Sequence, residues 1–195
     1  MRLAALCCAG VALAPAVASA AAADAPLRTI AIAGSEAHEL LELAAKEVRR
    51  YAYATTGAFP TIVRSRDGLV AEGAAAASTV VLATAREVVD DSGLSIMGGD
   101  NSDGDRLRAA SASVLAGGPD AHARERLDSG ATVLLGATPL SVLYAAYEYA
   151  ATDLGVYFAI DGDRIPRRSA RAAPPSGPSG SSSSQPRFAS RGAVP

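Results

Sequence analysis

The chain has very few of the residues that most often build catalytic and metal centres. Its 195 residues include two cysteines, two histidines and no tryptophan. Both cysteines, Cys7 and Cys8, lie within the first ten residues, in a segment that we expect to be removed. The remaining chain therefore predicts neither disulfides nor thiolate chemistry. The lack of tryptophan also weighs against a typical carbohydrate-binding module.

Neither sign of charge dominates the sequence. Eighteen lysines and arginines face twenty aspartates and glutamates, for a formal net charge of −2. This balance provides no basic field for nucleic acid and no polybasic patch for a membrane surface. Hydrophobic residues make up 49% of the chain, but many are alanines, which bury little area each. The composition therefore predicts one domain with a thin core.

Residues 1–20 have the pattern of a secretory signal peptide. Arg2 gives a short positive region, residues 3–17 form an apolar run, and Ala18-Ser19-Ala20 matches a small-x-small cleavage site. An uncleaved anchor is the alternative, and Pro15 within the run weighs against it. No other segment has the roughly 18 consecutive apolar residues of a membrane span. We expect a secreted protein, or one delivered to a periplasmic or lysosomal/vacuolar lumen, without stable membrane association after cleavage.

The segment 129–168 predicts a strand, a helix and a second strand. The apolar run 131–135 lies between two glycines, and Thr138-Pro139 then supplies an N-cap oxygen and a first-turn proline. An apolar stripe at helical spacing follows, and it comprises Leu140, Leu143, Tyr147, Ala150 and Leu154. Gly155 stands where a left-handed cap is favoured, before the second apolar run 156–160.

The preceding sequence supplies the other expected elements. We predict strands at 27–33, 59–64 and 78–84, a long helix over 35–55, a short helix from 86 to 91 and a helix around 105–115. Two amphipathic helices, 35–55 and 138–154, need a shared apolar surface. The expected fold class is therefore α+β: a mixed β-sheet with two long helices packed on one face, followed by a disordered linker.

Three segments carry a family resemblance. They are the helix with its Thr-Gly turn and Phe-Pro at 35–60, the segment 136–166 with Leu143, Tyr144, Tyr147, Gly155 and Pro166, and the tail PRFASRGAVP at 186–195. This chain resembles the N-terminal accessory domain of alpha-glucuronidase-type glycoside hydrolases (family 67) and the comparable domain of family 20 beta-hexosaminidases. The resemblance implies a sheet covered by two helices. Tyr157 departs from the family's usual arginine, and residues 97–129 match nothing in that pattern.

The resemblance and composition together predict the domain organisation. We expect a signal peptide at 1–20, the accessory α+β domain at 21–168, a Ser/Pro/Gly linker at 169–186, and the start of a catalytic barrel at 187–195. The linker composition cannot bury enough apolar surface to order itself. By resemblance the chain is a fragment truncated before the barrel, and carbohydrate would be bound by that barrel.

Glycoside hydrolysis needs two carboxyl groups on either side of the scissile bond. Asp161 and Asp163, just past a predicted strand, are the best-placed pair, but Asp-Gly-Asp is also ordinary turn chemistry, which we favour. Asp90 and Asp91 are expected at a helix end on the surface. We therefore predict no catalytic residue in this chain.

The metal and ligand candidates are equally weak. Residues 98–105 suggest a calcium loop, but with Gly104 in its sixth place the first and twelfth places fall on Gly99 and Ala110, which lack side-chain oxygen. We expect a disordered polar insertion there. His38 and His122 have no partner at a metal-binding spacing. No metal and no cofactor is predicted.

Six tyrosines could form a sugar-stacking platform: Tyr51, Tyr53, Tyr144, Tyr147, Tyr149 and Tyr157. At helical spacing Tyr147 is expected in the core, whereas Tyr53 and Tyr149 are expected to face solvent. Two functional hypotheses follow. The first is a non-catalytic accessory domain of a secreted, alpha-glucuronidase-like glycoside hydrolase. The second is a free-standing secreted carbohydrate-binding or interaction domain without enzyme activity.

Overall fold

The computed structural model describes residues 26–34, 38–65, 77–90, 101–166 and 182–184. Twelve elements lie in these ranges, in the chain order β1 (Thr29–Ala33), α1 (Glu39–Thr56), β2 (Thr61–Ser65), β3 (Thr79–Thr84), α2 (Ala85–Asp90), α3 (Asn101–Ala116), β4 (His122–Arg126), β5 (Thr132–Gly136), α4 (Pro139–Thr152), β6 (Tyr157–Ala159), β7 (Gly162–Arg164) and β8 (Ser182–Ser184). The predicted α+β class is confirmed.

The main sheet has the strand order β2-β1-β3-β5-β4-β8. The first four strands in this order are parallel, and Ile30 of β1 lies between Ile62 of β2 and Val80 of β3. Strand β4 runs antiparallel to β5, and β8 runs antiparallel to β4. The sheet is therefore mixed, as expected, and helix α1 connects its parallel strands β1 and β2.

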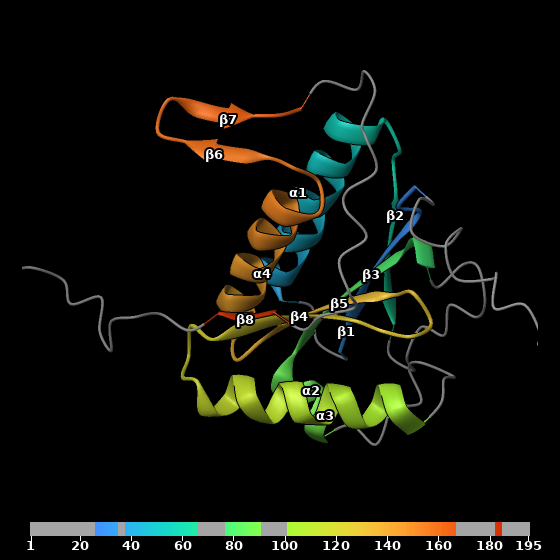
Figure 1. Ribbon diagram of the computed structural model, residues 1–195, viewed down its shortest axis with the longest axis vertical. Coiled ribbons are helices and arrows are strands. Elements are labelled where there is room, and N and C mark those ends of the chain that lie inside the picture. The colour runs from blue at the N-terminus through green and yellow to red at the C-terminus, as the bar shows by residue number, and fades with distance from the viewer. Residues whose placement is uncertain (1–25, 35–37, 66–76, 91–100, 167–181, 185–195) are drawn as a thin grey trace, which may run out of the picture.

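Helices α1 and α4 lie side by side on one face of this sheet (Figure 1). Alternate strand residues such as Ile30, Leu82 and Leu134 point to this face and are fully buried against Val48 of α1 and Val142 of α4. Each such side chain stabilises the fold by about 1.5–3 kcal/mol relative to an exposed one. The predicted packing of two long helices on one face is confirmed.

The opposite face is also covered, by α2 and α3 (Figure 1). The intervening strand residues, among them Val81, Val133 and Leu135, pack there against Leu107 and Val114 of α3. A strand that is buried on both faces reads as a continuous apolar run, as 79–83 and 131–135 do. The helix expected around 105–115 begins earlier, at Asn101, so the disordered insertion predicted over 98–105 is wrong for residues 101–105.

Four strands, β4, β6, β7 and β8, differ from expectation. Strand β4 lies in a segment for which no strand was predicted. The apolar run 156–160 forms β6, which pairs with β7 in a separate two-stranded hairpin instead of joining the main sheet. Residues 182–184, within the expected disordered linker, pair with β4, so that expectation is corrected at these three positions.

The start of α4 follows the sequence prediction closely. Thr138 is the N-cap and forms a capping box with Ser141, and Pro139 occupies the first turn. Gly155 has a φ of 70°, the left-handed conformation expected at that position. The predicted apolar stripe is correct for Leu143, Ala150 and Leu154, which are buried, but Leu140 is 38% exposed.

Candidate functional site

The two candidate carboxylates, Asp161 and Asp163, lie in the β6–β7 hairpin and make different contacts. The carboxylate of Asp163 accepts a hydrogen bond of 2.6 Å from the buried Tyr51 hydroxyl and lies 3.6 Å from the Arg50 guanidinium. Asp161 is exposed and lies 3.5 Å from Arg164 of β7. The turn interpretation is correct for Asp161, whereas Asp163 lies in strand β7.

Phe158 of β6 fixes the hairpin to the two helices. Its ring packs edge-on against Tyr51 of α1, with centroids 5.6 Å apart, and against Tyr147 of α4, at 5.5 Å. Phe158 and Asp163 are paired in the hairpin register, so both project from one face of it towards the helices. Burial raises the pKa of Tyr51, and the hydrogen bond to Asp163 raises it further.

His122 lies in a polar cluster between β4 and α4. Its Nε2 lies 2.9 Å from the Glu148 carboxylate, its Nδ1 lies 3.1 Å from the Asp120 carbonyl oxygen, and its ring contacts Tyr144. The hydrogen bond to Glu148 raises the pKa of His122, although its partial burial opposes the shift. Both neighbouring oxygens are acceptors, and only the imidazolium can donate to both.

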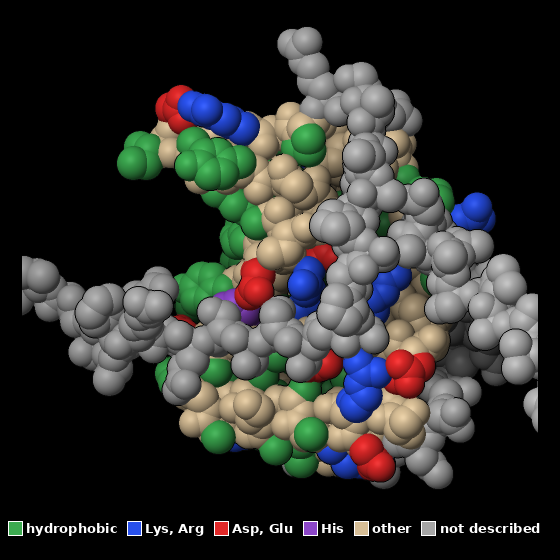
Figure 2. Space-filling model, in the orientation of Figure 1, with side chains coloured by type: hydrophobic (Ala, Val, Ile, Leu, Met, Phe, Trp, Pro, Cys, Tyr) green, Lys and Arg blue, Asp and Glu red, His purple; other side chains and the backbone are tan. Residues whose placement is uncertain are grey.

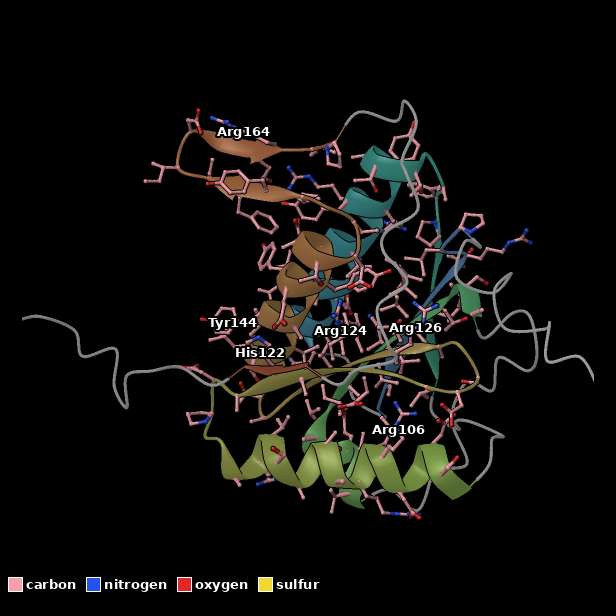
Figure 3. All side chains as sticks on the ribbon, viewed as in Figure 1. Arg106, His122, Arg124, Arg126, Tyr144 and Arg164 are labelled. Atoms are coloured by element: carbon pink, nitrogen blue, oxygen red, sulfur yellow. The ribbon has the colours of Figure 1, made fainter. Side chains whose placement is uncertain are left out.

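Side chains of β4 alternate between the two faces of the sheet. His122 and Arg124 lie on the face that carries α4, where Arg124 pairs with Asp153 and donates to Thr152 at 2.6 Å. Glu125 lies on the other face and is 4% exposed. Burial raises the pKa of Glu125, and the charge of Arg106 partly opposes the shift. Figure 3 shows His122, Arg124 and Tyr144 in one region of the molecule.

The carboxyl ends of the parallel strands are the usual ligand position in such sheets, and here capping contacts occupy the end of β3. Thr84 and Glu87 form a capping box, in which the Glu87 carboxylate accepts from the Thr84 backbone N–H at 2.9 Å. A Cβ on Gly34, at the end of β1, would come within 2.1 Å of the same carboxylate. The two strand ends are therefore packed closely together.

The structure also places the remaining candidate residues from the sequence. His38 caps α1, because its Nδ1 accepts from the Leu40 backbone N–H at 3.2 Å. Tyr53 is 58% exposed, as expected, but Tyr149 is 7% exposed, so the prediction that it faces solvent is wrong. Asp90 ends α2, and Asp91 and residues 98–100 lie outside the described ranges. Those ranges bring together no group of three or more metal-ligating side chains.

Sequence reasoning missed the residues that surround the tyrosines. Phe158, Glu148 and Arg50 each contact a candidate residue, and none of them was singled out. The local signal for Phe158 was available, because strand alternation places residues 158 and 160 on one face and 157 and 159 on the other. The contact between Tyr51 and Asp163, by contrast, joins residues 112 positions apart and has no local sequence signal.

A scan against models of known families and a search of curated proteins found no match to this chain. Among the helices of the described ranges, none is long and apolar enough to cross a membrane.

Proposed function

We propose that this chain is a non-catalytic accessory domain of a secreted glycoside hydrolase, alpha-glucuronidase-like, that acts on polysaccharide or oligosaccharide. The observation that supports it is the packing of α1 against α4 on one face of a mixed sheet. This is the arrangement that the resemblance implies. The two motif-bearing segments of the domain are α1 with its Thr-Gly turn and α4 with Gly155, so they meet in one helix pair.

The contacts of the carboxylates are consistent with an accessory role. A glycosidase places its acid and its base or nucleophile about 5–10 Å apart across a bound sugar. Asp163 is engaged by Tyr51 and Arg50 towards the helices, whereas Asp161 is exposed at the hairpin turn. We infer that the acid and base of the parent enzyme come from a barrel that follows this domain.

The second candidate function is a free-standing secreted domain that binds carbohydrate or another partner. It is favoured by the hydrophobic side chains that the hairpin exposes. Tyr157 is 64% exposed, Phe158 38%, and Ile160 fully. A ligand or partner surface would cover these exposed side chains.

Two measurements test the proposal. The first is to sequence the transcript beyond the codon for Pro195. An in-frame, barrel-sized continuation supports the accessory domain, whereas an immediate stop codon supports the free-standing alternative. The second is to assay residues 21–195 on aryl glycosides and glucuronoxylan oligosaccharides, where we expect no turnover. Turnover by this chain that disappears in Asp161→Asn or Asp163→Asn would contradict the proposal and make the domain an enzyme.

A further inference from the structure

Three aromatic side chains form a row on one side of the molecule. Phe158 of β6 packs on Tyr147 of α4 at 5.5 Å, and Tyr144 lies one helical turn before Tyr147. Residues three apart on a helix lie on the same face. His122, whose ring centroid is 6.3 Å from that of Tyr144, ends the row at β4. We call Phe158, Tyr147 and Tyr144 the aromatic row.

The aromatic row lies along a recess. Figure 2 shows a hollow on the left of the view, below the projecting hairpin, whose inner wall carries hydrophobic side chains. Figure 3 places Tyr144 and His122 at the lower end of this hollow and Arg164 on the hairpin above it. Phe158 is 38% exposed, and Tyr147 and Tyr144 are half-buried. The rings therefore remain accessible in part along a concave surface.

The rings are held in place from behind. Tyr51 is 2% exposed and supports Phe158 edge-on, while its hydroxyl anchors Asp163 of the same hairpin. Tyr147 is packed against the core that α1 and α4 share. A surface whose side chains are already ordered loses little conformational entropy when a ligand binds. The aromatic row therefore has the preorganisation of a binding surface.

Charged groups flank the aromatic row; the carboxylates among them are partly buried, whereas Arg50 is exposed. Near Phe158 and Tyr147 lie Glu47, Asp163 and Arg50, and the charges of all three affect the pKa of Tyr147, which burial raises. Glu148 lies at the other end, beside His122. Carboxylates accept hydrogen bonds from hydroxyl groups, and a guanidinium donates to hydroxyl oxygens. Exposed aromatic surface with hydroxyl-binding groups beside it suits a sugar, which has an apolar C–H face and a hydroxyl rim.

The charges also discriminate between sugars. Three of the flanking groups, Glu47, Asp163 and Glu148, are carboxylates. The cationic groups that contact them are already paired, Arg50 with Glu47 and Asp163, and His122 with Glu148. A uronic acid would bring a further negative charge next to these carboxylates, which is unfavourable. The surroundings of the aromatic row therefore favour a neutral sugar over an anionic one.

We propose that the aromatic row binds a neutral oligosaccharide chain, whose apolar sugar faces contact the exposed parts of Phe158, Tyr147 and Tyr144. This inference rests on the proposed function, because it assumes a protein that meets carbohydrate. The inference goes beyond the proposed function because it gives the accessory domain a ligand site of its own. That site would hold the uncharged part of a polysaccharide while another part of the protein performs hydrolysis.

The experiment is an NMR titration of ¹⁵N-labelled residues 21–195 with xylohexaose, repeated with cellohexaose and with an anionic oligogalacturonate. We expect shift changes at amides of residues 144–148 and 157–159, with the neutral chains binding more tightly than the anionic one. Tyr147→Ala removes an aromatic contact and is expected to weaken binding about tenfold, from about 1–2 kcal/mol of aromatic contact. Tyr144→Ala should weaken it similarly and provides a second test should Tyr147→Ala unfold.

Tyr53→Ala is the matched control. Tyr53 is a 58% exposed tyrosine of α1 whose ring packs against Phe59, so its removal should leave affinity unchanged. The proposal fails if no neutral oligosaccharide shifts these amides up to its solubility limit, or if shifts occur only elsewhere. It also fails if a polypeptide alone binds this surface. Either failure leaves the accessory role standing, because the transcript and the activity assay test that role separately.

Discussion

His122 Nε2 lies 2.9 Å from a Glu148 carboxylate oxygen, and this contact ties strand β4 to helix α4. The side chain of His122 is 13% exposed, and its second ring nitrogen faces the Asp120 carbonyl oxygen. The contact joins the antiparallel part of the sheet to the helix pair that covers the parallel part. It also sits beside Tyr144, at the lower end of the aromatic row.

The first prediction concerns the pH dependence of stability. The pKa of His122 in the folded protein is raised above its ordinary value near 6.5, so the folded state binds the proton more tightly. The stabilisation is fully present below pH 6.5 and is lost as pH rises through the folded pKa. His122→Gln should lower the free energy of unfolding by about 1–2 kcal/mol at acid pH and by less at pH 8. Urea denaturation from pH 5 to 8 measures the difference.

The matched control is His38→Gln, because His38 is exposed and makes a local cap contact with Leu40. That contact uses Nδ1 of His38 as the acceptor and needs no proton on it, so His38→Gln should not show a loss of stability that is greatest at acid pH. A difference between wild type and His122→Gln that stays constant from pH 5 to 8 would contradict the assigned contact.

A second prediction concerns the attachment of the hairpin. Tyr51→Phe removes the hydroxyl that donates to Asp163 while keeping the ring that supports Phe158. We expect a loss of about 1–2 kcal/mol and faster hydrogen exchange at residues 157–164. Tyr53→Phe, two positions away on the exposed side of α1, should leave both unchanged. Equal exchange in the hairpin of both variants would show that the hydroxyl does not anchor it.

The elements that the sequence predicted well are those with strong local signals. The N-cap and first-turn proline of α4 are specified by Thr138-Pro139, and the buried strands β3 and β5 are continuous apolar runs with β-branched residues. Such signals depend on neighbours in the chain and need no knowledge of the fold.

Strand β4 had no comparable signal. Its sequence HARER contains no β-branched residue and no Phe, Tyr or Trp, and its two buried residues are Ala123 and the charged Glu125. Pairing with β5 and coverage by α3 and α4 make it a strand, which is a tertiary effect. The candidate site was hidden for the same reason. The sequence contains Tyr51, Tyr147 and Phe158, but their contacts with one another depend on how the β6–β7 hairpin packs on helices α1 and α4. Local sequence patterns do not specify that packing.

A third prediction tests the face of α4 that packs on the sheet. Leu143 is buried at 8% exposure, and Leu140, one turn earlier, is 38% exposed. Leu143→Asp should destabilise the domain by at least about 3 kcal/mol, because it buries an unpaired charge. Leu140→Asp should change stability by less than about 0.5 kcal/mol, since an acid in the first helical turn is tolerated. Melting followed by circular dichroism distinguishes them, and similar losses in both variants would mean that the buried face is misassigned.

The last prediction concerns the tight junction between β5 and α4. A Cβ on Gly136 would lie 2.4 Å from the Val142 backbone nitrogen and 2.6 Å from the Ser141 hydroxyl. These atoms belong to the first turn of α4, whose capping box fixes their position. Gly136→Ala should therefore cost about 1–3 kcal/mol or more, because the backbone must move to relieve the overlap.

Gly104→Ala is the control, because the same change from glycine to alanine is expected to increase stability at this position. Gly104 lies within α3, and the atom that a Cβ there would meet is the far end of the Arg108 side chain, at 3.8 Å. Alanine is a better helix former than glycine, so this variant should stabilise the domain by about 0.5–1 kcal/mol. Because both variants add one methyl group, their opposite signs in urea denaturation would isolate the effect of the junction. If Gly136→Ala were as stable as wild type, β5 and α4 would have to lie further apart than this structure places them.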